Sequence, residues 1–266
     1  MGKFKAVFER VEKKYVLSEE QYRALRERLQ GIAKVDEYGE TGIYNIYYDT
    51  PDFHLIRQSL RKPKYKEKLR LRSYGIAGDD TPSFIEIKKK FKGVVYKRRI
   101  ELPYEEALHA LLAEEKEPEE KEDGNQISHE IKYLLRHYEG IRPAMAVAYD
   151  RIAMIGEEDP ELRITFDTNI RYSTTELDLR KGNHGKQILR PGEHLMEIKI
   201  TGALPLVLAH IFSELNIHPV TFSKYGRGYL QMRREEMQGS IARTVTQTQK
   251  TIAMPRRRLQ RVAASA

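Results

Sequence analysis

The sequence contains no cysteine. This absence excludes disulfide bridges, thiolate nucleophiles and zinc sites built on cysteine. Long apolar runs are missing too, because no stretch approaches the roughly 18 uninterrupted apolar residues of a membrane-spanning helix. The first twenty residues also lack the apolar segment of a secretion signal. We therefore expect a soluble, cytoplasmic chain without a transmembrane segment.

The usual nucleotide-binding and nucleophilic motifs are also absent from the sequence. It has neither a P-loop nor a complete GxGxxG motif, since Gly226–Gly228 supplies only a GRG fragment. No Ser-His-Asp pattern appears. The eight histidines show no metal-ligand spacing, so we expect surface or helix-capping roles for them. Any active site must therefore depend on other chemistry.

The net charge of +8 is unevenly distributed. Residues 238–266 contain six lysines and arginines and no acidic residue, whereas residues 1–237 contain 41 basic and 39 acidic residues. A nearly balanced main body is not typical of a uniformly basic nucleic-acid binder. We therefore do not expect nucleic acid as a partner, and the sequence leaves the oligomeric state open.

The 266 residues suffice for one large domain. Short alternating runs predict strands over residues 1–102 and 141–232, and helical spacing predicts helices near 18–29, 127–138 and 204–216. Ser18 and Gln21 fit a capping box ahead of the first helix. These patterns indicate an α+β domain over residues 1–232, built on an antiparallel sheet. Residues 233–266 lack apolar periodicity and are predicted to form a basic, disordered tail.

Charged residues alternate with apolar residues along six predicted strands. Because side chains at i, i+2 and i+4 share one face of a strand, each strand has one charged face and one apolar face. The aligned sets are Arg10, Glu12 and Lys14; Lys66, Lys68, Arg70 and Arg72; Glu86, Lys88 and Lys90; Lys97, Arg99 and Glu101; Arg163, Thr165, Asp167 and Asn169; and Glu197 and Lys199.

A solvated outer face could explain any one of these strands. Six such strands favour a different arrangement, because like charges in register repel one another and a bound polyanion would remove that cost. The predicted helices can cover the apolar face and leave the charged face inside. We therefore predict a closed, eight-stranded antiparallel β-barrel with a polar interior and helices packed on its outside.

Arginine, lysine and glutamate together suit a phosphate ligand that carries a metal ion. Arginine and lysine bind phosphate oxygens, whereas carboxylates fit a divalent cation that bridges phosphates. The interior therefore predicts a site for a polyphosphate or a nucleoside triphosphate, with Mn²⁺ or Mg²⁺ as cofactor. Metal candidates on the charged faces include Glu12 and Glu86, and phosphate-binding candidates include Arg10, Lys68, Lys90 and Arg99.

Eight short motifs, in matching order, give the sequence a resemblance to a known family. They are EKKY at 12–15, LRLRSYG at 69–75, IEIKKK at 85–90, YKRR at 96–99, YDR at 149–151, RITFDTN at 163–169, EIK at 197–199 and FSKYGRG at 222–228. In this combination the chain resembles the VTC-type polyphosphate polymerase domain, a member of the triphosphate tunnel metalloenzymes. The resemblance covers about residues 4–232.

The resemblance implies transfer of the ATP γ-phosphoryl group to a growing polyphosphate chain, so the implied partners are ATP, or another nucleoside triphosphate, and polyphosphate. It implies that Glu197 binds the metal and that Tyr149 and Ser223 add hydrogen bonds. The phosphate-binding residues implied by similarity are Lys14, Arg70, Arg72, Lys88, Lys97, Arg151, Arg163, Lys199 and Lys224. Among these we assign Arg70, Arg72, Arg151, Arg163 and Lys224 to catalysis. The chain departs from the ExExK start of the wider superfamily, because Arg10 replaces the first glutamate.

Two other functions stay open at this point. Hydrolysis of a triphosphate in the same tunnel would need several inward carboxylates, for which Glu12, Glu86, Glu101 and Asp167 are candidates. A non-catalytic module could instead bind polyanions. The basic run Pro255–Arg258 could guide a polyphosphate chain or contact an acidic surface, or it could simply be part of the disordered tail.

Overall fold

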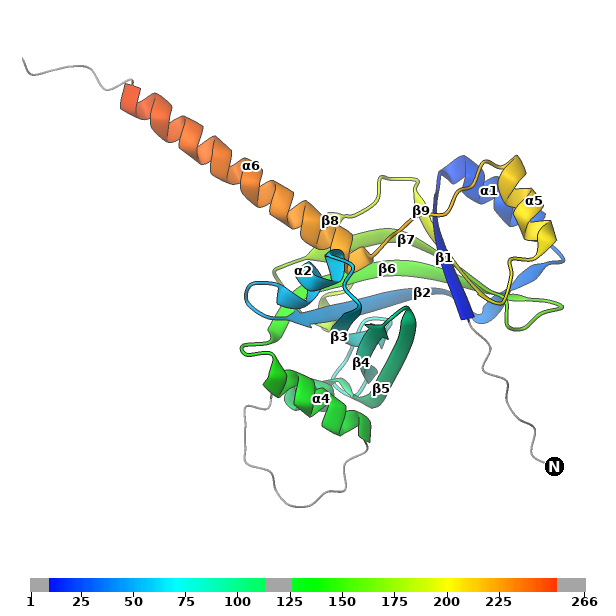
Figure 1. Ribbon diagram of the computed structural model, residues 1–266, viewed down its shortest axis with the longest axis horizontal. Helices are drawn as coiled ribbons and strands as arrows, with labels where there is room; N and C mark the ends of the chain where they lie inside the picture. Colours follow the sequence, from blue (N-terminus) through cyan, green and yellow to red (C-terminus); the bar gives the residue numbers. More distant parts are fainter. Residues whose placement is uncertain (1–9, 113–125, 253–266) are drawn as a thin grey trace, which may run out of the picture. The chain divides into compact units, whose positions relative to one another are not determined.

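The computed structural model describes residues 10–112 and 126–252, with side chains described for 11–112 and 126–241. By packing, the chain divides into two compact units, Met1–Gly228 and Tyr229–Ala266. Each unit is described by itself. The charged strands all belong to the first unit (Figure 1).

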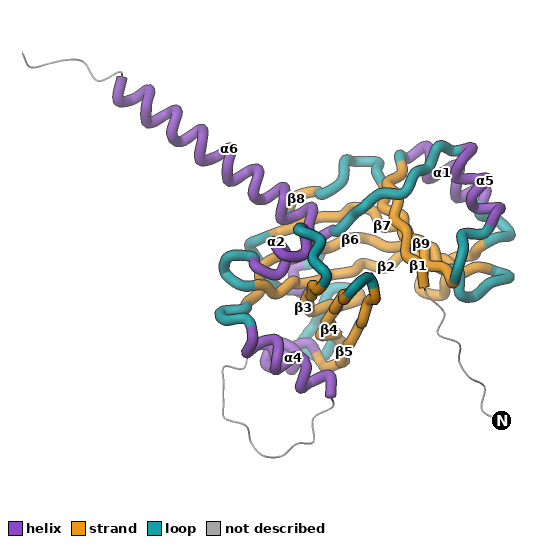
Figure 2. The backbone as a smooth tube through the Cα atoms, viewed as in Figure 1, coloured by secondary structure: helices purple, strands orange, loops and turns teal. Residues whose placement is uncertain are grey.

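Within the described residues, nine strands form one antiparallel sheet in the first unit (Figure 2). The strand order is β1-β9-β7-β6-β2-β3-β4-β5, and β8 pairs with β7. The strands are β1 (Arg10–Leu17), β2 (Ala33–Asp49), β3 (Tyr65–Tyr74), β4 (Pro82–Phe91), β5 (Val94–Pro103), β6 (Arg142–Gly156), β7 (Arg163–Ser173), β8 (Lys186–Gln187) and β9 (His194–Thr201). The α+β class and the antiparallel sheet are confirmed.

Hydrogen-bonded closure of the sheet, expected from the sequence, is not found in the described part of the chain. Strands β1 and β5 are the two ends of the pairing path and do not pair with each other. The ends nevertheless approach each other through their side chains. Glu12 on β1 interacts electrostatically with Lys88 on β4. Lys97 on β5 interacts in the same way with Lys199 on β9 and with Glu12 on β1. The sheet therefore curls, and its inner face is concave.

The outer face of β1, β7 and β9 is covered by α1 (Glu19–Arg28) and α5 (Leu206–Glu214). Leu25, Phe166, Ile198 and Phe212 belong to one buried cluster between these elements. The two helices lie side by side (Figure 1), where Arg28 forms an ion pair with Glu214. The predicted capping box at the start of α1 is confirmed, because the side chains of Ser18 and Gln21 each bond the other's backbone. This packing holds the charged residues of β1 and β9 on the inner face.

The outer face of β2 to β5 is covered by α3 (Tyr104–Leu112) and α4 (Gln126–His137). Ile46, Leu69, Ile87 and Leu134 belong to the buried cluster beneath them. This second cluster lies on the opposite face of β3 from the row of basic residues. The helices thus lie on the apolar outer face and leave the charged face inside, as predicted.

A short helix, α2 (His54–Leu60), was not anticipated from the sequence. Its start is fixed by Asp49, whose carboxylate accepts hydrogen bonds from the backbone N–H groups of Thr50, Leu55 and Ile56. The same carboxylate accepts a bond from the hydroxyl of Tyr225 at 2.8 Å. Asp49 therefore connects the end of β2 to the residues at the start of the last helix.

The last helix, α6, spans Lys224–Ile252 and begins in the first unit. Gly228 lets its first turn approach the sheet closely, because a Cβ there would lie 2.8 Å from Met145 Sδ and 3.2 Å from Tyr172 Cβ. The glycines of the GRG fragment thus serve close packing and do not form a phosphate-binding loop.

The prediction of a tail without regular structure is wrong for residues 233–252, which continue α6. Apolar periodicity indicates that a helix packs against other elements. A helix without such packing can still form from residues of high helix propensity and from side-chain pairs three or four residues apart. Arg233 and Glu236 form one such pair at 2.6 Å. The basic run at 255–258 lies outside the described residues. Among the described helices, none is long and apolar enough to cross a membrane.

Candidate phosphate-binding site

The basic row of β3 extends over the inner face of the sheet, where polar groups from neighbouring strands hold it. Arg70 Nε donates to Glu86 Oε2 at 2.6 Å, and its Nη1 donates to the hydroxyl of Tyr47 at 3.2 Å. Arg72 Nε donates to Asn45 Oδ1 at 2.8 Å. Arg70 and Arg72 alternate with Leu69 and Leu71 in the sequence, so the strand geometry that buries the leucines directs both guanidinium groups inward.

A second group of cations surrounds Asp167 on β7, whose side chain is fully buried. Arg151 Nε and Nη2 donate to Asp167 Oδ1 and Oδ2 at 2.6 and 2.8 Å, a bidentate pair. Lys224, from the first turn of α6, contacts the same carboxylate. Lys224 Nζ also lies 4.4 Å from the ring centroid of Tyr149. The start of α6 therefore contributes a buried cation to the face that the strands form.

Two carboxylates and a lysine meet where β1 pairs with β9. Lys14 Nζ lies 3.1 Å from Glu197 Oε1 and 3.3 Å from Glu12 Oε1. Lys224 Nζ is also 3.1 Å from Glu197 Oε1. Burial alone would raise the pKa of Glu197, but Lys224, Lys14 and Arg151 outweigh it and hold that pKa well below its usual value. Glu197 is therefore an ionised carboxylate inside a cationic environment.

Lys68 and Tyr47 form a pair with unusual proton affinities. Burial, helped by Lys88 and Lys14, lowers the pKa of Lys68 to about 8. Burial would raise the pKa of Tyr47, but Arg70 and Lys68 outweigh it and lower that pKa to about 8. The excess of positive charge on the inner face therefore makes a lysine give up its proton more easily and makes a tyrosine more acidic.

The last turn before α6 orients Lys68. Its Nζ donates to Ser223 Oγ at 3.0 Å, and Ser223 Oγ in turn accepts the backbone N–H of Gly226. Tyr225 stacks on Tyr47 with ring centroids 4.4 Å apart. The FSKYGRG segment thus contributes a hydroxyl, an ammonium group and an aromatic ring to one side of the site.

Lys88 on β4 and Lys97 on β5 are accessible to water although protein surrounds them on several sides. Burial lowers the pKa of both ammonium groups. Lys97 and Lys14 lower the pKa of Lys88 further. Lys199 and Arg70 do the same for the pKa of Lys97. This combination is expected of side chains on a hydrated concave surface, and the concave inner face of the sheet is called the channel below. An anion that entered the channel would stabilise their charged forms.

The structure brings most of the predicted site residues onto this one face. Those that share it through the contacts and charges described are Glu12, Lys14, Lys68, Arg70, Arg72, Glu86, Lys88, Lys97, Tyr149, Arg151, Glu197, Lys199, Ser223 and Lys224. Arg99 is exposed but pairs in register with Glu86 and lies 4.9 Å from the ring centroid of Phe84, so it borders the same face. Lys90 and Arg163 are exposed farther along their strands. The side chain of Arg10 lies outside the described side chains. The roles of all these residues stay predictions.

Sequence reasoning missed two polar residues of the inner face and gave a third only one role. Asn45 and Tyr47 hold Arg72 and Arg70, yet β2 was not among the strands with charged faces because its inner residues are uncharged. Asp167 was named only as a carboxylate for hydrolysis, whereas here it pairs with Arg151. The alternation of Asn45 and Tyr47 with Ile46 and Tyr48, which belong to the outer buried cluster, was the available signal.

The inner face also offers oxygen ligands for a divalent cation. Glu12 and Glu197 lie close enough for one ammonium group to contact both, and magnesium and manganese prefer carboxylate oxygens. No group of three or more acidic or histidine ligands occurs among residues 10–112 and 126–252. Two carboxylates fit a metal whose other positions are filled by phosphate oxygens and water. Glu86, by contrast, pairs with Arg70.

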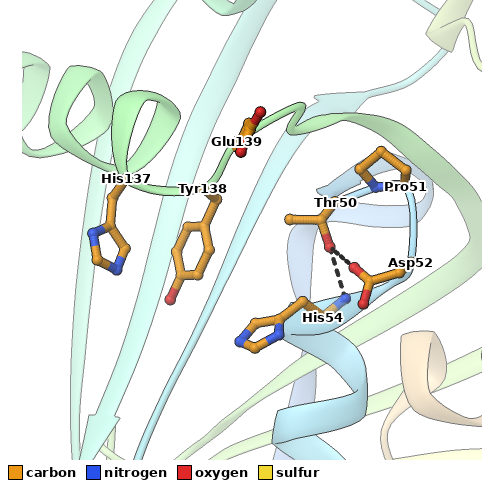
Figure 3. A pocket seen from close by; sticks show the side chains of 7 residues that line it. All are labelled: Thr50, Pro51, Asp52, His54, His137, Tyr138 and Glu139. Carbon is orange, nitrogen blue, oxygen red and sulfur yellow. Dashed lines mark hydrogen bonds between the residues drawn. The ribbon is translucent and has the colours of Figure 1, made fainter.

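A cavity of about 430 Å³ lies elsewhere in the first unit, between the start of α2 and the end of α4 (Figure 3). Its lining residues are Thr50, Pro51, Asp52, His54, His137, Tyr138 and Glu139, which include no lysine or arginine. Thr50 Oγ1 donates to Asp52 Oδ1 at 2.6 Å and accepts the backbone N–H of His54 at 2.9 Å. This cavity lacks the chemistry of a phosphate site, which belongs to the concave face of the sheet.

Comparisons with solved structures support the fold. The chain is similar to a provisionally assigned adenylate cyclase from Bacillus halodurans, with a TM-score of 0.50, 16% identity, and coverage of 80% of this chain and 92% of that one. It is also similar to a provisionally assigned adenylyl cyclase from Hippeastrum, described as having a dominant triphosphatase activity. There the TM-score is 0.51, the identity 12%, and the coverage 84% of this chain and 96% of that one. At these identities the likeness shows the fold alone.

A comparison with curated protein sequences found no match. A family profile described as the VTC domain matches residues 9–233. The match includes all nine strands of the described sheet and the start of α6. It therefore covers every residue that the structure places on the inner face. The resemblance seen in the eight motifs is confirmed, and the chain belongs to the VTC domain family.

Proposed function

We propose that this chain is a metal-dependent polyphosphate polymerase, which transfers the γ-phosphoryl group of ATP to the end of a polyphosphate chain. The observation that carries the proposal is the concentration of cations on a concave face in a body of nearly balanced charge. Arg70, Arg72, Arg151 and Lys224 lie there beside Glu197. A polyanion bound along this concave face would neutralise them.

The transfer itself needs no protein nucleophile. An oxygen of the acceptor's terminal phosphate forms a bond to the γ-phosphorus of ATP, while the bond from that phosphorus to the β,γ-bridging oxygen breaks. ADP leaves with the bonding electrons, and the chain is longer by one phosphate. The transition state is loose, so catalysis consists of positioning and of stabilising negative charge. Arg70, Arg72 and Arg151 would hold the phosphate oxygens, because the guanidinium fork matches them.

Glu197 and Glu12 would hold Mg²⁺ or Mn²⁺ together with phosphate oxygens. When bound, such a cation neutralises charge on the β- and γ-phosphates. Lys14 contacts both carboxylates, so it would move aside or share them with the cation. Arg163 and Lys199, which pair in register on β7 and β9, would extend phosphate binding toward the end of the channel. Tyr149 and Ser223 would add hydrogen bonds.

Hydrolysis of a triphosphate is the second candidate. It is favoured by the Hippeastrum protein of similar fold, which is described as having triphosphatase activity. Against it stands the pairing of the inner carboxylates. Glu86 is bound to Arg70, and Asp167 is bound to Arg151 and Lys224. A carboxylate held in this way is poorly placed to activate water, so the arrangement favours an acceptor that is already an anionic phosphate.

The proposal is tested by incubating the purified chain with ATP and either Mn²⁺ or Mg²⁺, and then separating the products on a gel. A ladder or smear of polyphosphate supports the polymerase. Release of inorganic phosphate alone supports the hydrolase. An unchanged ATP pool with retained polyphosphate binding supports a binding module. The Glu130→Gln variant is a suitable control, since Glu130 bridges Lys89 and Arg98 away from the inner face.

A further inference from the structure

The basic row on the inner face of β3 ends in an aromatic residue. Lys66, Lys68, Arg70 and Arg72 precede Tyr74 at alternate positions, so Tyr74 continues the same face. On the neighbouring strand, Phe84 pairs in register with Arg72. The rings of Tyr74 and Phe84 lie 5.5 Å apart and are almost perpendicular, at 78°. The phosphate-binding row therefore runs into an aromatic pair.

This aromatic pair is not part of the outer core. Phe84 lies on the opposite face of β4 from Ile85 and Ile87, which pack beneath the helices. Tyr74 is 45% exposed even though its strand neighbours Leu71 and Ser73 are fully buried. An isolated exposed tyrosine is ordinary. Tyr74 differs because a second ring packs against it and because it lies at the end of the row of cations proposed to bind phosphate. Its ring is therefore placed where a ligand could stack on it.

Two guanidinium groups flank the rings. Arg72 lies 5.9 Å from the centroid of the Tyr74 ring, and Arg99 lies 4.9 Å from that of Phe84. Arg99 comes from β5 and is exposed. Arginine planes and aromatic faces are the two surfaces on which nucleobases stack in proteins. The cluster of Tyr74, Phe84, Arg72 and Arg99 is called the aromatic platform below.

We propose that the aromatic platform binds the base of a nucleoside triphosphate, with the ring of Tyr74 as the stacking surface. This inference rests on the proposed function, because it assigns a binding surface to the base of the ATP that the proposed reaction uses. The phosphates would extend from Arg72 toward Arg70 and Lys68, into the channel. Two residues along a strand cover about 7 Å, which leaves the ribose between Tyr74 and the first phosphate contacts.

The composition of the platform also defines what it can recognise. Its four residues contain two rings and two cations and no amide that could read the edge of a base. Stacking is tolerant of base identity, because every base has a π-face. The site should therefore accept both adenine and guanine nucleotides, and it should bind a nucleoside triphosphate more tightly than its phosphates alone would explain.

The test compares binding of ATP, supplied as its β,γ-imido analogue so that the proposed reaction cannot consume it, with binding of tripolyphosphate, each with Mg²⁺, by calorimetry on the full chain. Tyr74→Ala should weaken ATP binding about tenfold, within the roughly 1–3 kcal/mol that one stacked base contributes, and should leave tripolyphosphate binding unchanged. Tyr74→Phe should retain both affinities. Tyr96→Ala is the matched control, because Tyr96 is 49% exposed on β5 but faces away from the channel.

Tyr74→Leu protects the test against misfolding, since it keeps apolar volume at the position but has no π-face. It should reproduce the selective loss. Equal loss for ATP and tripolyphosphate, or no loss for ATP, would overturn the platform, as would a wild-type chain that does not bind ATP. The readout is independent of turnover. A chain that makes no polyphosphate but shows the selective loss contradicts the proposed function and supports the platform.

Discussion

Lys14 and Glu197 face each other directly across β1 and β9, with Lys14 Nζ 3.1 Å from Glu197 Oε1. The same ammonium group also contacts Glu12. A cation of the protein thus lies between the two carboxylates that we assign to a metal ion. The contact shows that this position attracts positive charge, as the proposed metal site requires.

Substitution of Glu197 by glutamine should therefore abolish metal-dependent turnover. The change keeps the shape of the side chain but removes the charge that holds Lys14 and Lys224 and that would hold the proposed metal. By analogy with the loss of one preorganised catalytic group, we expect a fall of at least about 10²–10³-fold in kcat. The measurement is ATP turnover against metal concentration, with Glu130→Gln as control. A near-normal, metal-dependent rate in the Glu197 variant would remove Glu197 from the site.

Arg70→Lys should reduce turnover although it preserves charge. Arg70 bonds Glu86 and Tyr47 through different nitrogens, and lysine cannot reproduce this fork or bind a phosphate through two parallel hydrogen bonds. We expect a loss of about 10²-fold in kcat/KM. Arg98→Lys, on the outer side of β5 beside Glu130, is the matched control. Equal rates for the two variants would contradict a specific role for the guanidinium of Arg70.

Asp167→Asn should destabilise the free chain and make it more responsive to polyanions. The fully buried Asp167 neutralises Arg151 and Lys224, and breaking a buried pair costs about 3 kcal/mol or more. For a domain of this size that corresponds to a Tm lower by roughly 6–12 °C. Tripolyphosphate should restore more of the Tm in the variant than it adds to the wild type. Identical ligand-induced shifts would show that phosphate does not reach these cations.

Affinity for tripolyphosphate should fall as the pH rises through about 8. Burial lowers the pKa of Lys68 to about 8, so Lys68 loses its positive charge there. Tyr47, whose pKa the neighbouring cations lower to about 8, gains a negative charge over the same range. Both changes oppose anion binding, and at short range each should weaken it roughly tenfold or more.

Binding measured from about pH 7 to about pH 9.5 checks this expectation. Lys68→Arg should flatten part of the decline, because an arginine stays charged throughout this range. Tyr47→Phe should remove the contribution of the phenolate. An affinity that stays constant across the range in the wild type would place the bound anion away from Lys68 and Tyr47.

Much of this site follows from local rules. The alternation of Arg70 and Arg72 with Leu69 and Leu71 was sufficient to predict which residues share the inner face, because strand geometry leaves only two faces. The capping box of Ser18 and Gln21 was equally local. Asn45 and Tyr47 could not be assigned in this way, since an uncharged residue in an apolar strand gains its role only from the partner on the next strand.

Long-range features were harder to predict. Whether β1 and β5 pair depends on strand tilt and stagger over the whole sheet, which local alternation does not encode. The short helix α2 depends on Asp49, whose carboxylate bonds backbone groups up to seven residues later. Residues 233–252 were misjudged because a helix that lacks an apolar stripe resembles an unstructured segment in sequence.

The central claim is that the inner face transfers a phosphoryl group to phosphate and not to water. It is tested most directly with ATP labelled on its γ-phosphorus, incubated with the chain, Mn²⁺ and a short polyphosphate primer. The label and the released ADP are then quantified. The account predicts one label in lengthened polyphosphate for each ADP formed. Label found only in free inorganic phosphate, in an amount equal to ADP, would contradict it.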